Sequence, residues 1–514
     1  MSRASHAPRH RLNPRARPWS DDAEVDGRSA NSPSDIAVAR AAVSGATWIG
    51  AERVATNLIA LGAFIVLGRE LDPKSFGLVA AASSVVLFIR LFVDAGFSRA
   101  LVQRKTLTPE VINTAFWTSV LLGVTLSASV FVGAPVISAI FSEPELTPVT
   151  RALSVLFLLS AFDNTQSALV DRQMRFKVQA IRRFIATALA AAVGIALALA
   201  GAGVWALVAQ TLTLEVGLVI MLWTLAKWRP SWQFSMQSFR ELFGWGSKFL
   251  GIRTLYYMYQ NADNFLIGWI LGPFPLGIYV IGYRVLSVVN EVLALTIEQV
   301  ALPLFSRYQD DVKSLRQAFA YASSVGAVIG WPVYAFLALT SSQLVPIVFG
   351  EQWKASIPVM EALSLAGFVQ VAWSSLRVAM IATAHIGNEL RWNIVLTVAS
   401  VGGFIAAVHL GVVAVAISLG IVGAALLPWR AARVARLCHL DVGEFFRNIM
   451  RPGVATLVMA VGVEPIKLSF NHTSPVGAVA CEVLAAAATY PICLRVFAPT
   501  AWRSAIRAAR SLKH

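Results

Sequence analysis

Charged and hydrogen-bonding side chains recur at helical spacing inside long apolar stretches of this chain. Between residues 246 and 270 they follow steps of three or four residues, at Arg253, Tyr256, Tyr257, Gln260 and Asn264. Such steps place side chains on one face of a helix. An arginine offers a planar fork of donors that matches phosphate oxygens, and it stays charged when buried. The stripe therefore predicts a polar surface able to hold an anionic group.

Three further apolar stretches carry similar stripes. Arg284, Glu291 and Glu298 are seven residues apart between 276 and 302, and Arg90 and Asp94 are four apart between 75 and 98. Residues four apart on a helix can also pair with each other, so Arg90 and Asp94 form either part of a cavity or an ion pair that holds helices together.

A fourth arginine, Arg53, stands two hundred residues before Arg253. Arg53 and Asn57 lie on one face between residues 44 and 67. Asp163 and Asp263 are additional acids in apolar surroundings. Ionisable groups at membrane depth are expensive and commonly face a cavity or each other. Some of the acids could neutralise arginines, and others could bind a coupling proton or cation.

The elements that must position these residues are membrane helices. The chain has 514 residues, of which 57% are hydrophobic and only 14% charged, whereas about 25% are charged in soluble proteins. Apolar stretches of about 20 residues are long enough to cross a bilayer. We count about fourteen, which predicts an all-α integral membrane protein and excludes a soluble α/β enzyme.

The segments that connect two pairs of apolar stretches share a pattern of leucine, proline and glycine. Leu71, Pro73 and Gly77 recur two hundred residues later as Leu271, Pro273 and Gly277. Proline and glycine at these places predict helix–turn–helix corners. Six stretches separate the corners, an even number, so both halves enter the membrane in the same direction. This predicts two six-helix lobes related by parallel duplication, followed by two C-terminal helices.

The duplication predicts a division of the chain. We expect a disordered cytoplasmic tail, an N-lobe of six helices, a C-lobe of six helices, a pair of added helices and a cytoplasmic C-terminal tail, over residues 1–42, 43–230, 231–440, 441–498 and 499–514 respectively.

The net charge of +15 is a topology signal. With the N-terminal tail in the cytoplasm, 33 lysines and arginines fall in cytoplasmic segments and 4 in outer loops, and six lie inside apolar stretches. This asymmetry is the one that membrane insertion favours. We therefore expect a multi-pass protein of the cytoplasmic membrane with both termini inside, and no nucleic-acid partner.

Sequence motifs for catalysis are missing. The sequence has no phosphate-binding GxxxxGK[ST] loop, and its histidines and three cysteines lack metal-ligand spacing. We expect a secondary transporter rather than an enzyme, with no cofactor and no metal.

Several short stretches together resemble a known family. From residue 40 to 440 the chain is similar to the polysaccharide transporters that flip lipid-linked oligosaccharides, within the multidrug/oligosaccharidyl-lipid/polysaccharide exporter superfamily. The stretches that carry the resemblance are LDPKSFGLVA, NTAFW, ALVDRQMRFK, GVWALVAQ, ADNFLIGWILGPFPLGIY, LPLFSRYQDD and VFGEQW.

The resemblance implies a flippase for polyprenyl-pyrophosphate-linked oligosaccharide repeat units in cell-surface polysaccharide biosynthesis. It implies alternating access coupled to an ion gradient, with the bilayer and the polysaccharide polymerase machinery as partners. The residues expected to bind substrate are Arg53, Arg253, Arg90, Arg284, Tyr256, Tyr257, Gln260 and Asn264, and those expected to bind the coupling ion are Asp94, Asp263, Glu291, Glu298 and Asp163. The alternatives are a multidrug or cation antiporter of the same superfamily and a membrane enzyme or scaffold of envelope glycan assembly.

Overall fold

The computed structural model describes the polypeptide over residues 33–104, 106–226, 228–307, 311–383, 385–438, 440–469 and 475–503. Within these ranges the chain is helical and contains no β-strand. The first half holds α1 (Pro33–Glu70), α2 (Pro73–Asp94), α3 (Phe97–Gln103), α4 (Pro109–Ile140), α5 (Leu146–Arg172), α6 (Phe176–Leu199) and α7 (Val204–Leu225). The second half holds α8 (Met236–Ile270), α9 (Pro273–Arg307), α10 (Val312–Phe349), the short 3₁₀ helix η1 (Glu351–Ser356), α11 (Ile357–Ala382), α12 (Ile386–Val408), α13 (Val412–Cys438), α14 (Val442–Ser469) and α15 (Pro475–Phe497).

The prediction of an all-α integral membrane protein is confirmed. Ten helices among the described residues are long and apolar enough to cross a membrane: α2, α4–α7, α10–α13 and α15. The remaining long helices, α1, α8, α9 and α14, are not among these ten. Each of the fourteen predicted stretches coincides over most of its length with one long helix, and the stretch between 75 and 98 extends past the end of α2 into α3. That all fourteen cross the bilayer stays a prediction.

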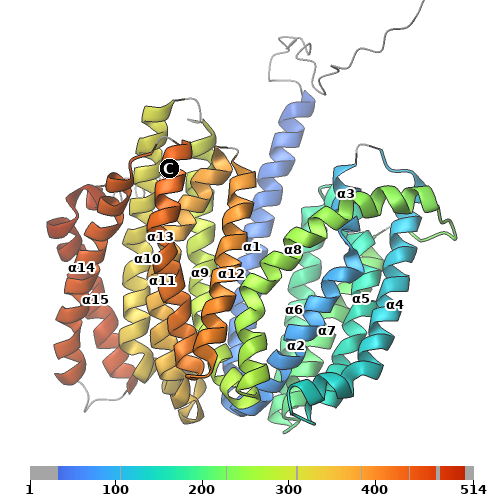
Figure 1. The fold of residues 1–514 in the computed structure, drawn as a ribbon, viewed down its shortest axis with the longest axis horizontal. Coiled ribbons are helices and arrows are strands. Elements are labelled where there is room, and N and C mark those ends of the chain that lie inside the picture. The colour runs from blue at the N-terminus through green and yellow to red at the C-terminus, as the bar shows by residue number, and fades with distance from the viewer. Residues whose placement is uncertain are drawn as a thin grey trace, which may run out of the picture.

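Two groups of helices pack in the same order. In the N-lobe, α1 packs on α6, α2 on α5, α4 on α5, and α7 on both α5 and α6. In the C-lobe, α8 packs on α12, α9 on α11, α10 on α11, and α13 on both α11 and α12. Figure 1 shows these two bundles beside each other, with α14 and α15 at the outer edge of the C-lobe. The repeated order of contacts is the structural form of the repeated sequence.

The two predicted corners meet each other. Both α2 and α9 begin at a proline, and the side chain of Asp72 accepts a hydrogen bond from the Ser75 amide at the start of α2. A Cβ added to Gly77 would lie 1.7 Å from the carbonyl oxygen of Pro273, and one added to Gly277 would lie 1.8 Å from that of Pro73. Each glycine therefore lets the other lobe's backbone approach closely.

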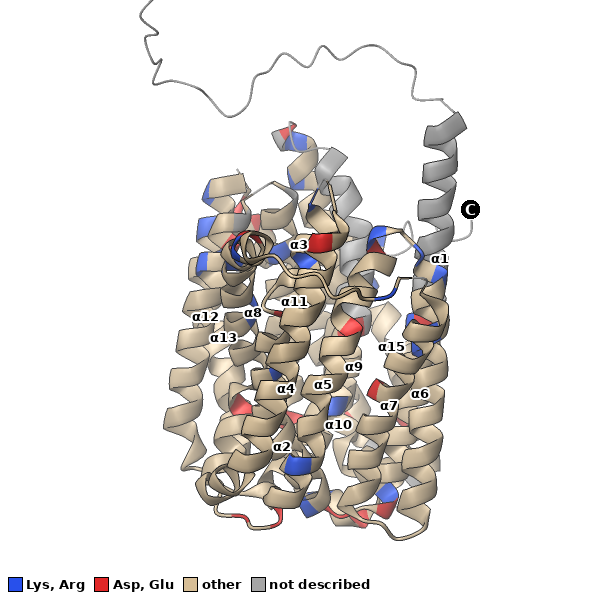
Figure 2. Ribbon diagram, turned by 90° about the vertical axis from the view of Figure 1, so that its right-hand side faces the viewer, with Lys and Arg blue, Asp and Glu red and all other residues tan. Residues whose placement is uncertain are grey.

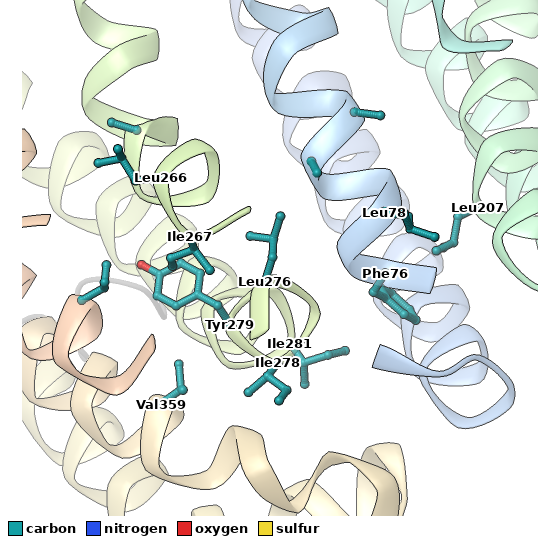
Figure 3. Packing of buried hydrophobic residues seen from close by; sticks show 14 of the residues in the cluster. Phe76, Leu78, Leu207, Leu266, Ile267, Leu276, Ile278, Tyr279, Ile281 and Val359 are labelled. Carbon is teal, nitrogen blue, oxygen red and sulfur yellow. The ribbon is translucent and has the colours of Figure 1, made fainter. Parts of the chain in front are cut away.

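Apolar side chains fill the space around this crossing. Leu276, Tyr279 and Ile281 of α9 are fully buried, and Phe76 of α2 is 4% exposed. In Figure 3 these side chains lie with neighbours from α8, α7 and α11. The end of the bundle that contains residues 71–72 and 271–272 is called the corner end below.

A second contact closes the corner end. Trp353 of η1 is fully buried, and its Nε1 donates to the carbonyl of Gly68 at 2.6 Å. The Gln352 amide donates to the carbonyls of Gly68, Arg69 and Leu71 at 2.9, 3.2 and 3.1 Å. The guanidinium of Arg69 donates in return to the carbonyls of Ile347 and Val348. C-terminal carbonyls of a helix lack partners within the helix, so this C-lobe segment caps α1.

At the opposite end, α8 begins on the N-lobe. The segment before it packs on α4: the side-chain amide of Asn113 donates to the Ser231 hydroxyl at 2.7 Å, and the rings of Trp117 and Trp232 stack. Farther along, a Cβ on Gly246 would lie 2.3 Å from the carbonyl oxygen of Ala95. In Figure 1, α8 runs obliquely from this end of the N-lobe into the C-lobe. The predicted boundary at residue 230 thus precedes a segment that rests on the N-lobe.

The last two helices pack on the outside of the C-lobe. Both α14 and α15 contact α10. Gln343 donates a hydrogen bond to the buried carboxylate of Glu482 at 2.8 Å, and the Tyr490 hydroxyl donates to the carbonyl of Val328.

Candidate functional site

Charged side chains inside the N-lobe pair with each other. Arg90 of α2 forms two parallel hydrogen bonds to Glu215 of α7, both 2.8 Å long. Arg182 of α6, which is 3% exposed, donates to Asp163 of α5 at 2.6 Å. A buried charge needs such a partner, because burial alone is costly. These four groups connect helices within the N-lobe.

The alternative of an Arg90–Asp94 ion pair is wrong. Arg90 is paired with Glu215, and Asp94 accepts from the backbone amide and hydroxyl of Ser98 at 2.9 and 2.6 Å. The second oxygen of Asp94 lies 3.4 Å from Arg253 of α8. The helical step suggested a local pair, but the side chains reach partners on other helices instead.

One side of α8 faces the N-lobe. Besides the contact of Arg253 with Asp94, the Tyr257 hydroxyl donates to the carbonyl of Ser84 at 2.8 Å. The Arg253 guanidinium remains 47% exposed and also lies over the ring of Phe249, 6.0 Å from its centre. Arg253 and Tyr257 therefore connect α8 to α2, across the boundary between lobes.

The adjacent side of α8 faces a cavity in the C-lobe. Tyr256 and Gln260 line it, and the Gln260 amide donates to the Tyr256 hydroxyl at 2.8 Å. The predicted stripe is therefore divided between two surroundings. Asn264 belongs to neither group: its backbone amide donates to Asp263, and its side-chain oxygen is buried without a partner in the described part of the chain.

The cavity has a volume of about 500 Å³ and lies between α8, α9, α11, α12 and α13. Its lining combines five aromatic rings with amides, hydroxyls and three groups that carry charge, Asp263, Glu291 and Arg377. The side chains used below are Tyr256, Tyr259, Gln260 and Asp263 from α8, Tyr283, Asn290 and Glu291 from α9, and Gln370, Trp373 and Arg377 from α11. Small-molecule pockets are commonly 300–1,000 Å³, with an apolar and aromatic lining and a few placed polar groups.

Contacts behind the cavity wall fix several of these side chains. The Tyr279 hydroxyl donates to Asp263 at 2.7 Å, and the Tyr334 hydroxyl donates to the side-chain oxygen of Asn290 at 2.5 Å. Trp373 donates through its indole nitrogen to the carbonyl of Gly423 at 3.1 Å. The guanidinium of Arg430 lies 4.3 Å from the centre of the Trp373 ring.

Arg430 is itself buried and paired. It is 2% exposed and donates to both carboxylate oxygens of Glu389 at 2.9 Å. Its charge is thus balanced behind the wall, and Trp373 is held in one orientation.

The other residues predicted to bind substrate or a coupling ion do not form one cluster. Arg53 is exposed on α1. Arg284 lies over the ring of Phe64, 5.6 Å from its centre, and its buried Nε has no hydrogen-bond partner within the described ranges. Glu291 is exposed at the cavity. Glu298 lies in the part of α9 whose side chains are outside the described residues.

Reasoning from sequence missed the contribution of α11. Gln370, Trp373, Ser374 and Arg377 recur at steps of three, one and three residues, so they share one face of the helix. The same spacing drew attention to α8. The pattern in α11 is less conspicuous, because Arg377 is the one charged residue of these four and the surrounding residues are mostly apolar.

A family model described as polysaccharide biosynthesis protein matches residues 66–358. The matched range covers more than half of the chain and runs from the end of α1 through the capping segment η1. The chain belongs to this family. The resemblance found in the sequence is thereby confirmed.

Three relatives support the assignment to this polysaccharide biosynthesis family. The teichuronic acid biosynthesis protein TuaB of Bacillus subtilis is 25% identical over 84% of this chain and 90% of its own length. The lipopolysaccharide biosynthesis protein WzxC of Escherichia coli is 26% identical over 69% and 73%. The succinoglycan biosynthesis transport protein ExoT of Rhizobium meliloti is 25% identical over 80% and 83%.

Solved structures share the fold of this family member. The lipid II flippase MurJ in an inward closed conformation has a TM-score of 0.72 at 13% identity, covering 87% of this chain and 98% of that one. An inward-facing multidrug resistance transporter of the MATE family has a TM-score of 0.56 at 19% identity, covering 74% and 95%. The predicted exporter-superfamily fold is confirmed.

Proposed function

We propose that this protein is a flippase that moves polyprenyl-pyrophosphate-linked oligosaccharide repeat units across the cytoplasmic membrane. The family match over residues 66–358 carries the proposal, because it includes both corners and the helices that bring the lobes together. Relatives named for lipopolysaccharide biosynthesis and succinoglycan transport support a cell-surface glycan as cargo. The product would pass to the polysaccharide polymerase machinery at the outer surface.

The charge distribution supports an orientation. Figure 2 shows Lys and Arg residues gathered towards the end of the bundle that contains α3. Positive residues favour the cytoplasmic side, so the corner end would face outwards and both termini would lie in the cytoplasm. The contacts of Trp353, Gln352 and Arg69 then close the outer side in this structure.

Transport by alternating access requires this outer closure to open. The cargo's pyrophosphate would bind between the lobes at Arg253, and Arg53 is the exposed arginine at the equivalent position of α1. Arg253 is already close to Asp94 at 3.4 Å. Phosphate oxygens would replace this long contact with shorter, bidentate hydrogen bonds.

Coupling to an ion gradient can act through the same pair. A proton on Asp94 would remove the charge that holds Arg253, which frees the guanidinium for the cargo. Asp263 and Glu291 remain candidates for a coupling ion in the C-lobe. Asp163 is a weaker candidate because its carboxylate already accepts a hydrogen bond from Arg182.

Deletion of the gene tests the function. In such a strain, lipid-linked repeat units should accumulate on the cytoplasmic leaflet, as measured by their protection from an external glycosidase in intact cells. Expression of the wild-type chain should restore outer-leaflet exposure, whereas Arg253→Ala, at equal membrane abundance, should not. Normal exposure in the deletion strain would exclude the flippase function and favour an enzyme or scaffold of glycan assembly.

A further inference from the structure

The C-lobe cavity combines flat apolar surfaces with neutral hydrogen-bonding groups. Tyr256, Tyr259, Tyr283 and Trp373 contribute rings, while Gln260, Asn290 and Gln370 contribute amides. A sugar ring has the complementary character, since its C–H face is apolar and its rim carries hydroxyls. Aromatic bodies with polar partners suit ligands of this mixed kind.

The charges in the cavity do not suit a pyrophosphate. Arg377 is the arginine of its lining, and it shares the space with the carboxylates of Asp263 and Glu291. A multiply charged anion is stabilised by several positively charged hydrogen-bond donors, such as arginine and lysine side chains. Two acids beside one arginine would repel it. Carboxylates and amides, by contrast, are good acceptors and donors for hydroxyl groups.

Several polar groups of the lining are oriented in advance. The Asn290 oxygen is held by Tyr334, and its amide nitrogen has no protein acceptor within the described ranges. Gln370 is exposed towards the cavity, and the Trp373 ring is fixed by Gly423 and Arg430. A site held in its binding geometry loses less entropy when a ligand enters.

The described residues of the N-lobe differ from this lining at the equivalent positions of α1 and α2. The two-hundred-residue offset pairs Tyr259 with Ile59, Gln260 with Ala60 and Asp263 with Ala63. The residue equivalent to Asn290 is Arg90, and its guanidinium already donates to the carboxylate of Glu215. At these equivalent positions the C-lobe carries polar groups that line a cavity, whereas the N-lobe carries apolar side chains and a paired arginine.

We infer that this C-lobe cavity is a glycan subsite, which binds one or two sugar units of the cargo and selects among repeat units. The inference rests on the proposed function and deepens it. Gln370 and Asn290 donate to sugar hydroxyls, Glu291 accepts from them, and Tyr256 and Trp373 cover the ring faces. The pyrophosphate stays with the arginines between the lobes, so the two parts of the cargo have separate sites.

Binding experiments with two probes test this separation. The full-length chain in nanodiscs is titrated with the free oligosaccharide released from the host's own surface polysaccharide, and separately with inorganic pyrophosphate. Gln370→Ala should weaken the oligosaccharide about tenfold, as expected for one lost hydrogen bond in a desolvated site, and should leave pyrophosphate binding unchanged. Gln237→Ala, an exposed glutamine on α8 outside the cavity, is the matched control and should change neither.

Tyr256 provides a second test that does not threaten the fold, because its side chain is 52% exposed. Tyr256→Ala should weaken oligosaccharide binding, whereas Tyr256→Phe keeps the ring and should retain most of it. Equal oligosaccharide binding by the wild type, Gln370→Ala and Tyr256→Ala would overturn the subsite.

Export measurements distinguish this failure from failure of the proposed function. If the deletion strain loses outer-leaflet repeat units but the cavity variants restore them fully, for native and truncated glycans alike, the protein is a flippase without this subsite. If the deletion strain exposes repeat units normally, both proposals fail. Loss of export of the native glycan, with a truncated lipid-linked sugar still exported, supports the subsite.

Discussion

The two lobes have the same order of helix contacts but different interiors. In the N-lobe, buried charges form closed pairs, such as Arg182 with Asp163. In the C-lobe, polar side chains line a cavity of about 500 Å³. Where the lobes meet, both retain proline and glycine at equivalent positions. The two halves thus share the geometry of the contact between the corners, which is called the joint below. Their interiors differ: ion pairs connect the helices of the N-lobe, whereas the C-lobe contains a cavity that can accept a ligand.

The largest effect should come from breaking a closed pair in the N-lobe. Arg182 is buried, and Arg182→Ala leaves the partly buried carboxylate of Asp163 without this partner. Removal of one member of a buried ion pair costs about 3–5 kcal/mol. We expect a strong fall in thermal stability of the purified protein in detergent. The paired replacement Arg182→Met with Asp163→Leu should recover much of it, and a stable Arg182→Ala protein would contradict the assigned role of the pair.

The joint should respond equally from either lobe. Gly77→Ala and Gly277→Ala each place a methyl group against the opposing proline carbonyl. Overpacking of this kind costs about 1–3 kcal/mol. We expect similar destabilisation for both variants by thermal melting. Clearly unequal values would show that the two crossings differ, and Gly62→Ala, which has open space around it, is the control.

The cavity should respond in function rather than in stability. Gln260 is exposed, so Gln260→Ala should change the free energy of unfolding by less than about 0.5 kcal/mol. Export of the surface polysaccharide, measured per molecule in the membrane, should nevertheless fall several-fold. A variant that lost stability and export together would make the C-lobe cavity structural, like the N-lobe pairs.

The smallest effect should come from the exposed side of a corner. Lys74 forms ion pairs with Glu143 and Glu145 in the N-lobe, and its C-lobe equivalent is the exposed Phe274. Exposed pairs contribute little, so Lys74→Phe should shift the melting temperature by no more than the error of measurement. A large shift would mean that this difference between the corners matters.

Features that depend on residues near each other in sequence could be predicted, whereas contacts between residues far apart in sequence could not. The helices and corners could be predicted, because apolar length and the Pro73 and Gly77 signals are local in sequence. The partner of Arg90 could not, since Glu215 lies 125 residues away and only packing brings α7 beside α2. The division of the α8 stripe between Tyr256 and Tyr257 could not be predicted either. Adjacent residues on a helix point about 100° apart, and the positions of the neighbouring helices decide which surroundings each one meets.

The reciprocal contact of the corners has a consequence for the origin of the chain. Gly77 touches Pro273 while Gly277 touches Pro73, which is the relation that a twofold axis imposes on two identical subunits. In such a contact the same self-complementary surface is used on both sides, so a single ancestral sequence can form both halves of it. The present chain is in this respect a covalently linked homodimer. Once the halves were joined, each interior could change without its copy, and the asymmetric cavity became accessible to evolution.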